Sequence, residues 1–102
     1  EKTGHKGSVV YMYIGHPVDA QGHAISDETR IQVNDHYVSV YEIPGAIAEA
    51  RDRMSSDERM HLTVNIHADR DTDMGIISDV KQALRQAGAY RINYSATEKP
   101  KD

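Results

Sequence analysis

The chain has 102 residues and a formal net charge of −4 at pH 7, from 12 basic and 16 acidic side chains. This length predicts one domain with a single modest core, which has to be aliphatic because Phe, Trp and Cys are all absent. The absence of Cys excludes disulfides and thiolate chemistry, and the mixed charges form no basic stripe, which argues against a nucleic-acid partner.

The segment 1–7 is polar and glycine-rich, which is typical of a linker, and the strand predicted after it is apolar on both faces. One face carries Val9, Tyr11 and Tyr13, and the other carries Val10, Met12 and Ile14. A strand of this kind is covered on two sides or is shared with another chain. We therefore expect the segment 8–14 to take part in self-association or partner docking, through Val9, Tyr11, Met12 and Tyr13. The alternative is a strand that lies in mid-sheet and whose side chains reach solvent at their polar ends.

A long loop and a hairpin are predicted next. The segment 15–28 keeps no hydrophobic period, and a loop of this length in a small domain is often functional or mobile. The strands 30–34 and 36–41 then form a hairpin around a turn at Asn34 and Asp35.

A first helix is predicted to begin near Pro44, because the first turn of a helix tolerates the missing N–H of proline. Its apolar face is formed by Ile43, Ile47, Ala50 and Met54. A polar connection over 55–59 leads from this helix to the next strand.

The stretch 62–96 has the pattern of a strand, a helix, a glycine stop and a second strand, which is a compact β-α-β unit. Thr72 and Asp73 offer a helix cap and a first-turn carboxylate, and Gly88 stands where a helix C-terminus favours a left-handed residue. The predicted structural start and stop of this helix are therefore Asp69, Thr72, Asp73 and Gly88.

The order of these elements gives two successive β-α-β crossovers, and the right-handed rule places both helices on one side of the sheet. Polar residues on the opposite side of the strands agree with an open face. We predict an α/β (α+β) two-layer sandwich, with a mixed four- or five-stranded sheet and two helices on one face. The domain spans 8–96, and the charged tail 97–102 has little reason to be ordered.

Four features of the stretch 62–96 occur together at a characteristic spacing: Ala68-Asp69 at the end of a strand, the apolar helix positions Ile77, Val80 and Leu84, the helix end Gln86-Ala87-Gly88, and Arg91-Ile92 in the last strand. In these features the chain resembles the C-terminal half of the periplasmic domain in the ExbD/TolR family of biopolymer-transport proteins. The resemblance covers this stretch closely and the rest of the chain in outline.

The resemblance implies a non-enzymatic interaction domain in a proton-motive-force-driven complex for TonB- or Tol-type transport across the outer membrane. The chain would be the periplasmic domain of a single-pass inner-membrane protein, with the linker 1–7 following a membrane helix that carries the family's proton-coupling carboxylate. The implied partners are a second copy in a homodimer, an ExbB/TolQ-like channel subunit and a TonB- or TolA-like protein. The TolR branch also contacts peptidoglycan, and both branches stay open because the loop 15–28 departs from both.

Strand addition is the binding mode that we predict, because a sheet edge can accept an extended segment of a partner. The segment 90–95, with Tyr90, Ile92 and Tyr94, is the first candidate because it ends the regular structure. The segment 8–14 is the second candidate, by exchange between chains.

Other kinds of site have weaker support. Asp69, Asp71 and Asp73 begin like a calcium loop, but the Gly and Glu that an EF-hand requires are missing from its later positions. His67 and Asp69 share one side of a strand, but the other histidines lie in a linker, a loop and strand ends without any short-range ligand pairing. We predict no catalytic residue, metal or cofactor, with a small-ligand or metal-binding regulatory domain as the alternative function and a small hydrolase as the weakest option.

Overall fold

The computed structural model describes residues 6–17, 19–23, 28–34 and 36–97. It contains a mixed five-stranded sheet in the order β3-β2-β1-β4-β5. The strands are β1 Val9–Gly15, β2 Arg30–Val33, β3 His36–Val38, β4 Thr63–Asp69 and β5 Arg91–Thr97. The α-helices are α1 Ile43–Asp52, α2 Ser56–Met60 and α3 Met74–Gln86, with short 3-10 helices η1 at Lys6–Ser8 and η2 at Val40–Glu42. None of the helices in the described part of the chain has the length and apolarity to cross a membrane.

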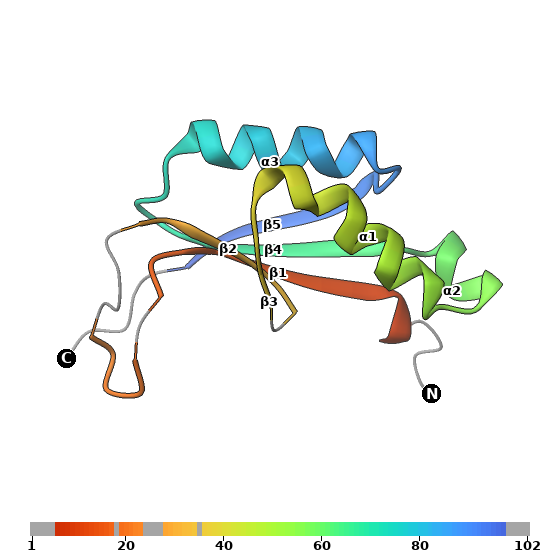
Figure 1. Ribbon diagram of the computed structural model, residues 1–102, viewed down its shortest axis with the longest axis horizontal. Helices are drawn as coiled ribbons and strands as arrows, with labels where there is room; N and C mark the ends of the chain where they lie inside the picture. Colours follow the sequence, from red (N-terminus) through yellow and green to blue (C-terminus); the bar gives the residue numbers. More distant parts are fainter. Residues whose placement is uncertain (1–5, 18, 24–27, 35, 98–102) are drawn as a thin grey trace.

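The two long helices cover the same face of the sheet (Figure 1). Strands β1, β4 and β5 are parallel, whereas β2 is antiparallel to both of its neighbours, β1 and β3. Strand β3 therefore runs in the same direction as β4, and the two crossovers through α1 and α3 both connect strands of like direction. The two-layer α+β sandwich with a mixed sheet is confirmed.

The core lies between this sheet and the helices. Alternate strand residues face the helices and are almost fully buried, and the largest of them on β1, β2 and β4 are Val10, Met12, Ile14, Ile31, Val33, Val64 and Ile66. The helices meet them with Ile43, Ile47, Ile77, Val80 and Leu84. The intervening strand residues point away from the helices and are half-buried or exposed, except for Gly15 and Asp69 at the ends of β1 and β4, which are buried. Each strand thus divides its residues between a covered face and an open face.

The position of β1 agrees with the alternative prediction, a strand in mid-sheet. Strand β1 lies in mid-sheet, between β2 and β4, and the helices cover only one of its faces. Met12 is 1% exposed, whereas Tyr11 on the opposite face is 54% exposed. Tyrosine tolerates this half-wet position because its ring is apolar and its hydroxyl reaches solvent or a polar partner.

Two local predictions are wrong. The segment predicted as a polar connection contains the short helix α2, which begins with a capping box: Ser55 Oγ accepts from the N–H of Glu58, and Glu58 Oε1 accepts from the N–H of Ser55. The strand predicted over 36–41 ends at Val38, because Ser39 and Glu42 form a second capping box that starts η2. The turn residue Asn34 has a positive φ of 53°, and position 35 lies outside the described residues.

Helix α3 begins one residue later than predicted. Asp73 is its N-cap and accepts a 2.8 Å hydrogen bond from the N–H of Gly75. Thr72 is buried and its hydroxyl donates to the carbonyl of Ile14, so it holds the helix start to β1 instead of capping the helix. Asp69 is the last residue of β4 and is no part of the helix start.

Gly88 ends α3 in the predicted left-handed conformation, with φ 84°. The N–H of Ala89 donates to the carbonyl of Leu84 and the N–H of Gly88 donates to the carbonyl of Arg85, which together form a Schellman motif. Arg51 of α1 donates to the carbonyl of Ala87 beside this motif. A Cβ at position 88 would lie 2.9 Å from Arg51 Nη2. Gly88 therefore fixes both the helix end and its contact with α1.

We predict that Gly88→Val lowers the free energy of unfolding by more than about 1 kcal/mol, because valine resists the left-handed conformation and crowds the Arg51 guanidinium. Urea unfolding followed by far-UV circular dichroism measures the change. Gly45→Ala in α1 is the control: a Cβ there meets no atom within 4 Å, so this variant should be neutral or more stable. Equal stability of Gly88→Val and the wild type would contradict this account of the helix end.

Candidate functional site

The strand β5 forms one edge of the sheet and is the main candidate for partner binding. It pairs with β4 without interruption from Arg91 opposite Thr63 to Thr97 opposite Asp69, and within the described residues no strand pairs with its other side. It is seven residues long and contains no proline. The opposite edge, β3, has only three residues before η2 begins. Strand β5 therefore presents the longer row of unpaired backbone groups.

The predicted partner-binding residues of this segment occupy different positions around the edge. Tyr90 precedes β5 and is 75% exposed. Ile92 is partly buried and packs against the core, so it holds the strand in place. Tyr94 lies on the helix-covered face, where the ammonium of Lys81 from α3 is 5.0 Å from the centroid of its ring. Tyr90 and Tyr94 are thus the tyrosines that an added strand would meet.

On its open face, β5 is tied to β4 by a ladder of polar side chains. The amide of Asn93 donates to Asn65 Oδ1 at 2.9 Å, and Ser95 Oγ lies 3.0 Å from Nδ1 of His67. Direct cross-strand pairs of this kind each stabilise a sheet by roughly 0.2–1 kcal/mol. The edge is therefore held as a regular strand even though one of its sides has no strand neighbour.

The segment 8–14 does not provide an edge. Strand β1 is paired on both sides, with β2 through residues 12–15 and with β4 through residues 9–14. Met12 is wholly inside the core, so within one chain it cannot meet a partner. Exchange of the segment 8–14 between chains would have to re-form both ladders with the partner chain, and it stays a prediction. Only Val9, Tyr11 and Tyr13 face the uncovered side.

The tyrosines are divided among several surfaces. The pairing registers place five side chains in one row across the open face: Tyr37, Gln32, Tyr13, His67 and Ser95. Tyr11 lies in the next row, and the guanidinium carbon of Arg30 is 4.5 Å from the centroid of the Tyr37 ring. Tyr41, at 93% exposure, belongs to η2 and lines an open groove of about 520 Å³ beside α1 and α3.

A second group of polar side chains lies where the parallel strands β1 and β4 end. Asp69, the last residue of β4, is 3% exposed. Its Oδ1 accepts a 2.5 Å hydrogen bond from the hydroxyl of Tyr13, and its Oδ2 accepts a 3.2 Å bond from the backbone N–H of His16. Gly15 makes this approach possible, because a Cβ on it would lie 2.4 Å from Asp69 Oδ2 and 2.7 Å from the Tyr13 hydroxyl.

The environment of Tyr13 is strongly negative. Desolvation by burial raises the pKa of the Tyr13 hydroxyl well above its usual range, and the hydrogen bond to Asp69 and the charges of Asp69 and Asp71 raise it further. Tyr13 therefore stays protonated and donates to Asp69. Its role is to orient the Asp69 carboxylate.

Among the described residues, one group of three side chains could hold a metal ion: His16, Asp69 and Asp71, whose ligand atoms all lie within 4.8 Å of one another. The predicted pair of His67 and Asp69 is not brought together in this group. Sequence reasoning missed His16 because it is 53 residues from Asp69, and only the parallel pairing of β1 with β4 brings their ends together.

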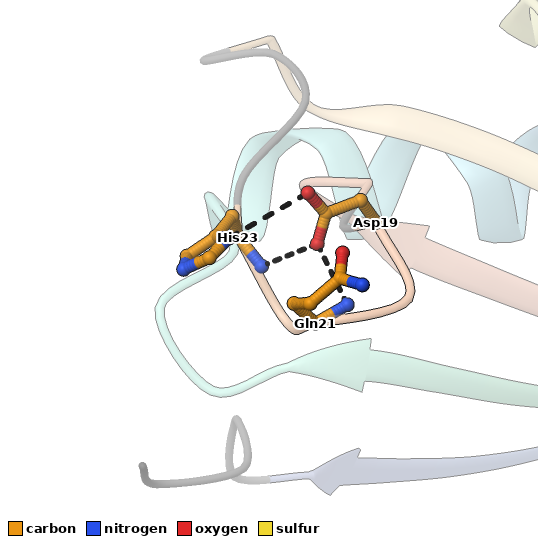
Figure 2. A network of polar contacts seen from close by, with 3 residues as sticks. All are labelled: Asp19, Gln21 and His23. Carbon is orange, nitrogen blue, oxygen red and sulfur yellow. Dashed lines mark hydrogen bonds and ion pairs between the residues drawn. The ribbon is translucent and has the colours of Figure 1, made fainter.

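The loop after β1 contains a local turn centred on Asp19 (Figure 2). Asp19 Oδ1 accepts 2.9 Å hydrogen bonds from the N–H groups of Gln21 and His23, and Asp19 Oδ2 lies 3.6 Å from Nδ1 of His23. An aspartate that binds the backbone two residues ahead forms an Asx turn, an ordinary structural motif. Positions 18 and 24–27 of the predicted loop lie outside the described residues.

Comparisons with known proteins leave the family assignment as a resemblance. No protein-family model matches the chain, and no curated protein matches it either.

We predict that Met12→Lys and Tyr11→Lys have opposite outcomes although the two residues are neighbours in β1. Met12→Lys places a charge in the core and should lower the free energy of unfolding by at least about 3 kcal/mol or prevent folding. Tyr11→Lys should stay within about 1 kcal/mol of the wild type, because position 11 faces solvent. Urea unfolding of both variants tests this, and a destabilised Tyr11→Lys with a stable Met12→Lys would reverse our assignment of the two faces.

Proposed function

We propose that the chain is an ExbD/TolR-like periplasmic interaction domain, and that it binds an extended segment of a TonB- or TolA-like partner by strand addition at β5. The sequence resemblance and the two-layer fold expected from it support the first part. The seven-residue free edge of β5 supports the second part and is the observation that carries the proposal. The role is non-enzymatic: the domain transmits or regulates force through binding.

Strand addition draws affinity from main-chain hydrogen bonds and selectivity from the side chains that flank the edge. On the helix side, the flank consists of Tyr94 under Lys81, so an apolar or aromatic side chain of the partner would pack there. On the open side, the flank carries the exposed side chains of Asn93 and Ser95, which suit a polar residue. The partner segment would therefore alternate apolar and polar residues.

The expected affinity is low. Each main-chain hydrogen bond contributes about 0.5–1.5 kcal/mol net, because it replaces a bond to water. Association costs at least about 4 kcal/mol in lost translational and rotational freedom. A short segment therefore binds weakly and reversibly, which suits a domain that engages and releases its partner repeatedly.

The remaining parts of the proposal rest on the resemblance. The domain would be held at the inner membrane by a helix outside this sequence, in a homodimer that passes through an ExbB/TolQ-like channel subunit. Two tethered copies have a high effective concentration, so two weak β5 edges can act together. In a TolR-like protein, peptidoglycan would be a further partner.

The alternative function is a ligand- or metal-binding regulatory domain. The group at the ends of β1 and β4 is the specific observation in its favour, since ligands of open α/β sheets bind beyond the carboxyl ends of the parallel strands. This group is compatible with the interaction role, because it lies at the end of the sheet and leaves the length of β5 free.

A heteronuclear NMR titration tests the proposal, using the chain and an extended peptide from the periplasmic linker of a TonB- or TolA-like protein of the same host. We predict shift changes along 90–95 and slower hydrogen exchange of β5 amides on binding. A peptide of the same sequence with alternate N-methylated residues is the matched control, because it keeps the side chains but cannot pair with a strand.

The variants Tyr94→Ser and Tyr37→Ser refine the test. Tyr94→Ser should weaken binding, whereas Tyr37→Ser at the opposite edge should leave it unchanged. Equal binding of the N-methylated peptide, or shifts confined to the loop 15–28 and the histidines with β5 silent, would refute strand addition at β5 and favour the ligand-binding alternative.

A further inference from the structure

The carboxylate of Asp69 is buried without a charged partner among the residues that the structure describes. Its two donors are the Tyr13 hydroxyl and the backbone N–H of His16, which are both neutral. A buried carboxylate in a folded protein is generally paired with a cation or coordinated to a metal ion. Two neutral donors satisfy part of its hydrogen-bonding capacity, since an ionised carboxylate has about four acceptor positions.

His16 carries the second unsatisfied group. Among the buried side-chain nitrogen and oxygen atoms of the described residues, His16 Nδ1 is the one without a hydrogen-bond partner. Neutral imidazole offers one nitrogen as a donor and the other as an acceptor or metal ligand. A buried polar atom without a partner is uncommon in folded proteins and is often explained by a bound water or ion.

His16 and Asp69 belong to the same cluster of residues, whose third member is the exposed Asp71 two residues after the end of β4. We propose that His16, Asp69 and Asp71 bind a divalent transition-metal cation, with Zn²⁺ as the preferred ion. Three protein ligands leave at least one coordination position for water. The ligand atoms lie within 4.8 Å of one another, and this upper limit is larger than the separation of ligand atoms around a tetrahedral ion. The exposed Asp71 side chain therefore moves inward when the ion binds.

The surroundings of the cluster match those of a metal site. A ligating carboxylate is normally oriented by a hydrogen-bond donor behind it, and Tyr13 plays this part for Asp69. Gly15 leaves the space in which Asp69 approaches the end of β1, because any Cβ there would overlap the carboxylate. One imidazole and two carboxylates favour Zn²⁺ or Mn²⁺ over Ca²⁺ and Mg²⁺, which prefer oxygen ligands alone.

The consequence of binding is mechanical. His16 is the first residue after β1, and Asp71 lies in the connection from β4 to α3. A shared ion would therefore join the start of the loop 16–29 to the start of α3 and fix the end of the sheet. Metal binding would raise the stability of the chain and order this end without touching the β5 edge.

Isothermal titration calorimetry of the 102-residue chain with ZnCl₂ tests the proposal. We expect saturable binding of one ion per chain, with a dissociation constant well below about 1 mM, and weaker binding of CaCl₂ and MgCl₂. His16→Gln and Asp71→Asn should each abolish this binding or weaken it at least about 10-fold, and Tyr13→Phe should weaken it about 10- to 100-fold because Asp69 loses its orienting donor. In the wild type, the imidazole ¹⁵N resonances of His16 should shift on addition of the ion.

Two control variants keep the test decisive. His67→Gln and His36→Gln alter exposed histidines outside the cluster and should leave Zn²⁺ binding unchanged. If Asp69→Asn fails to fold, His16→Gln and Asp71→Asn still decide, because neither residue belongs to the hydrophobic core. Absence of saturable binding, wild-type affinity in His16→Gln and Asp71→Asn, or loss of binding in His23→Gln instead would overturn the proposal. The peptide titration at β5 is independent of every one of these outcomes.

Discussion

The parallel pairing of β1 with β4 is the constraint on which the rest of the molecule depends. It places six consecutive residues of each strand side by side in the middle of the sheet, so that Val10, Met12 and Ile14 meet Val64, Ile66 and Ala68 under the helices. Burial of apolar area contributes about 25 cal/mol per Å², and these six residues are almost fully buried. The same pairing brings His16 to Asp69 and leaves β5 at the margin.

This arrangement separates three surfaces with different chemistry. The helix-covered face is aliphatic and closed, the open face carries tyrosines and hydrogen-bonded polar pairs, and the β5 margin offers backbone groups. The charged side chains are of both signs and leave a net charge of only −4. A partner would therefore be selected by main-chain pairing and by the side chains beside the edge, more than by electrostatic steering. In the proposed role, a long edge strand tethered beside a second copy would suit weak and repeated engagement of an extended chain.

The sequence predicts most of the elements and the two-layer architecture, but it does not predict the short helix α2 or the contacts that depend on strand register. Some elements form for local reasons and can be identified from the sequence. The signals are the alternation of apolar and polar residues in 62–67, the helical period before Gly88 and the proline in the first turn of α1. Ser55 and Glu58 are a capping signal for helix α2, but the helix itself has only five residues, which is too short to give a helical period. The two apolar faces of β1 left its position open, since a strand shared between chains and a central strand with tyrosines on its open side give the same pattern. The contact of His16 with Asp69 depends on strand register, which no local pattern encodes.

Residue-resolved amide hydrogen exchange of the chain alone most directly tests the central claim that β1 and β4 form the rigid middle while one side of β5 stays free. At a concentration where sedimentation shows a monomer, the amides of β1 should exchange most slowly, because two neighbouring strands and the core protect them. Along β5, amides directed away from β4 should exchange as fast as those of exposed loops, and those directed toward β4 should be protected. Uniform protection of β5 equal to that of β1 would contradict the account.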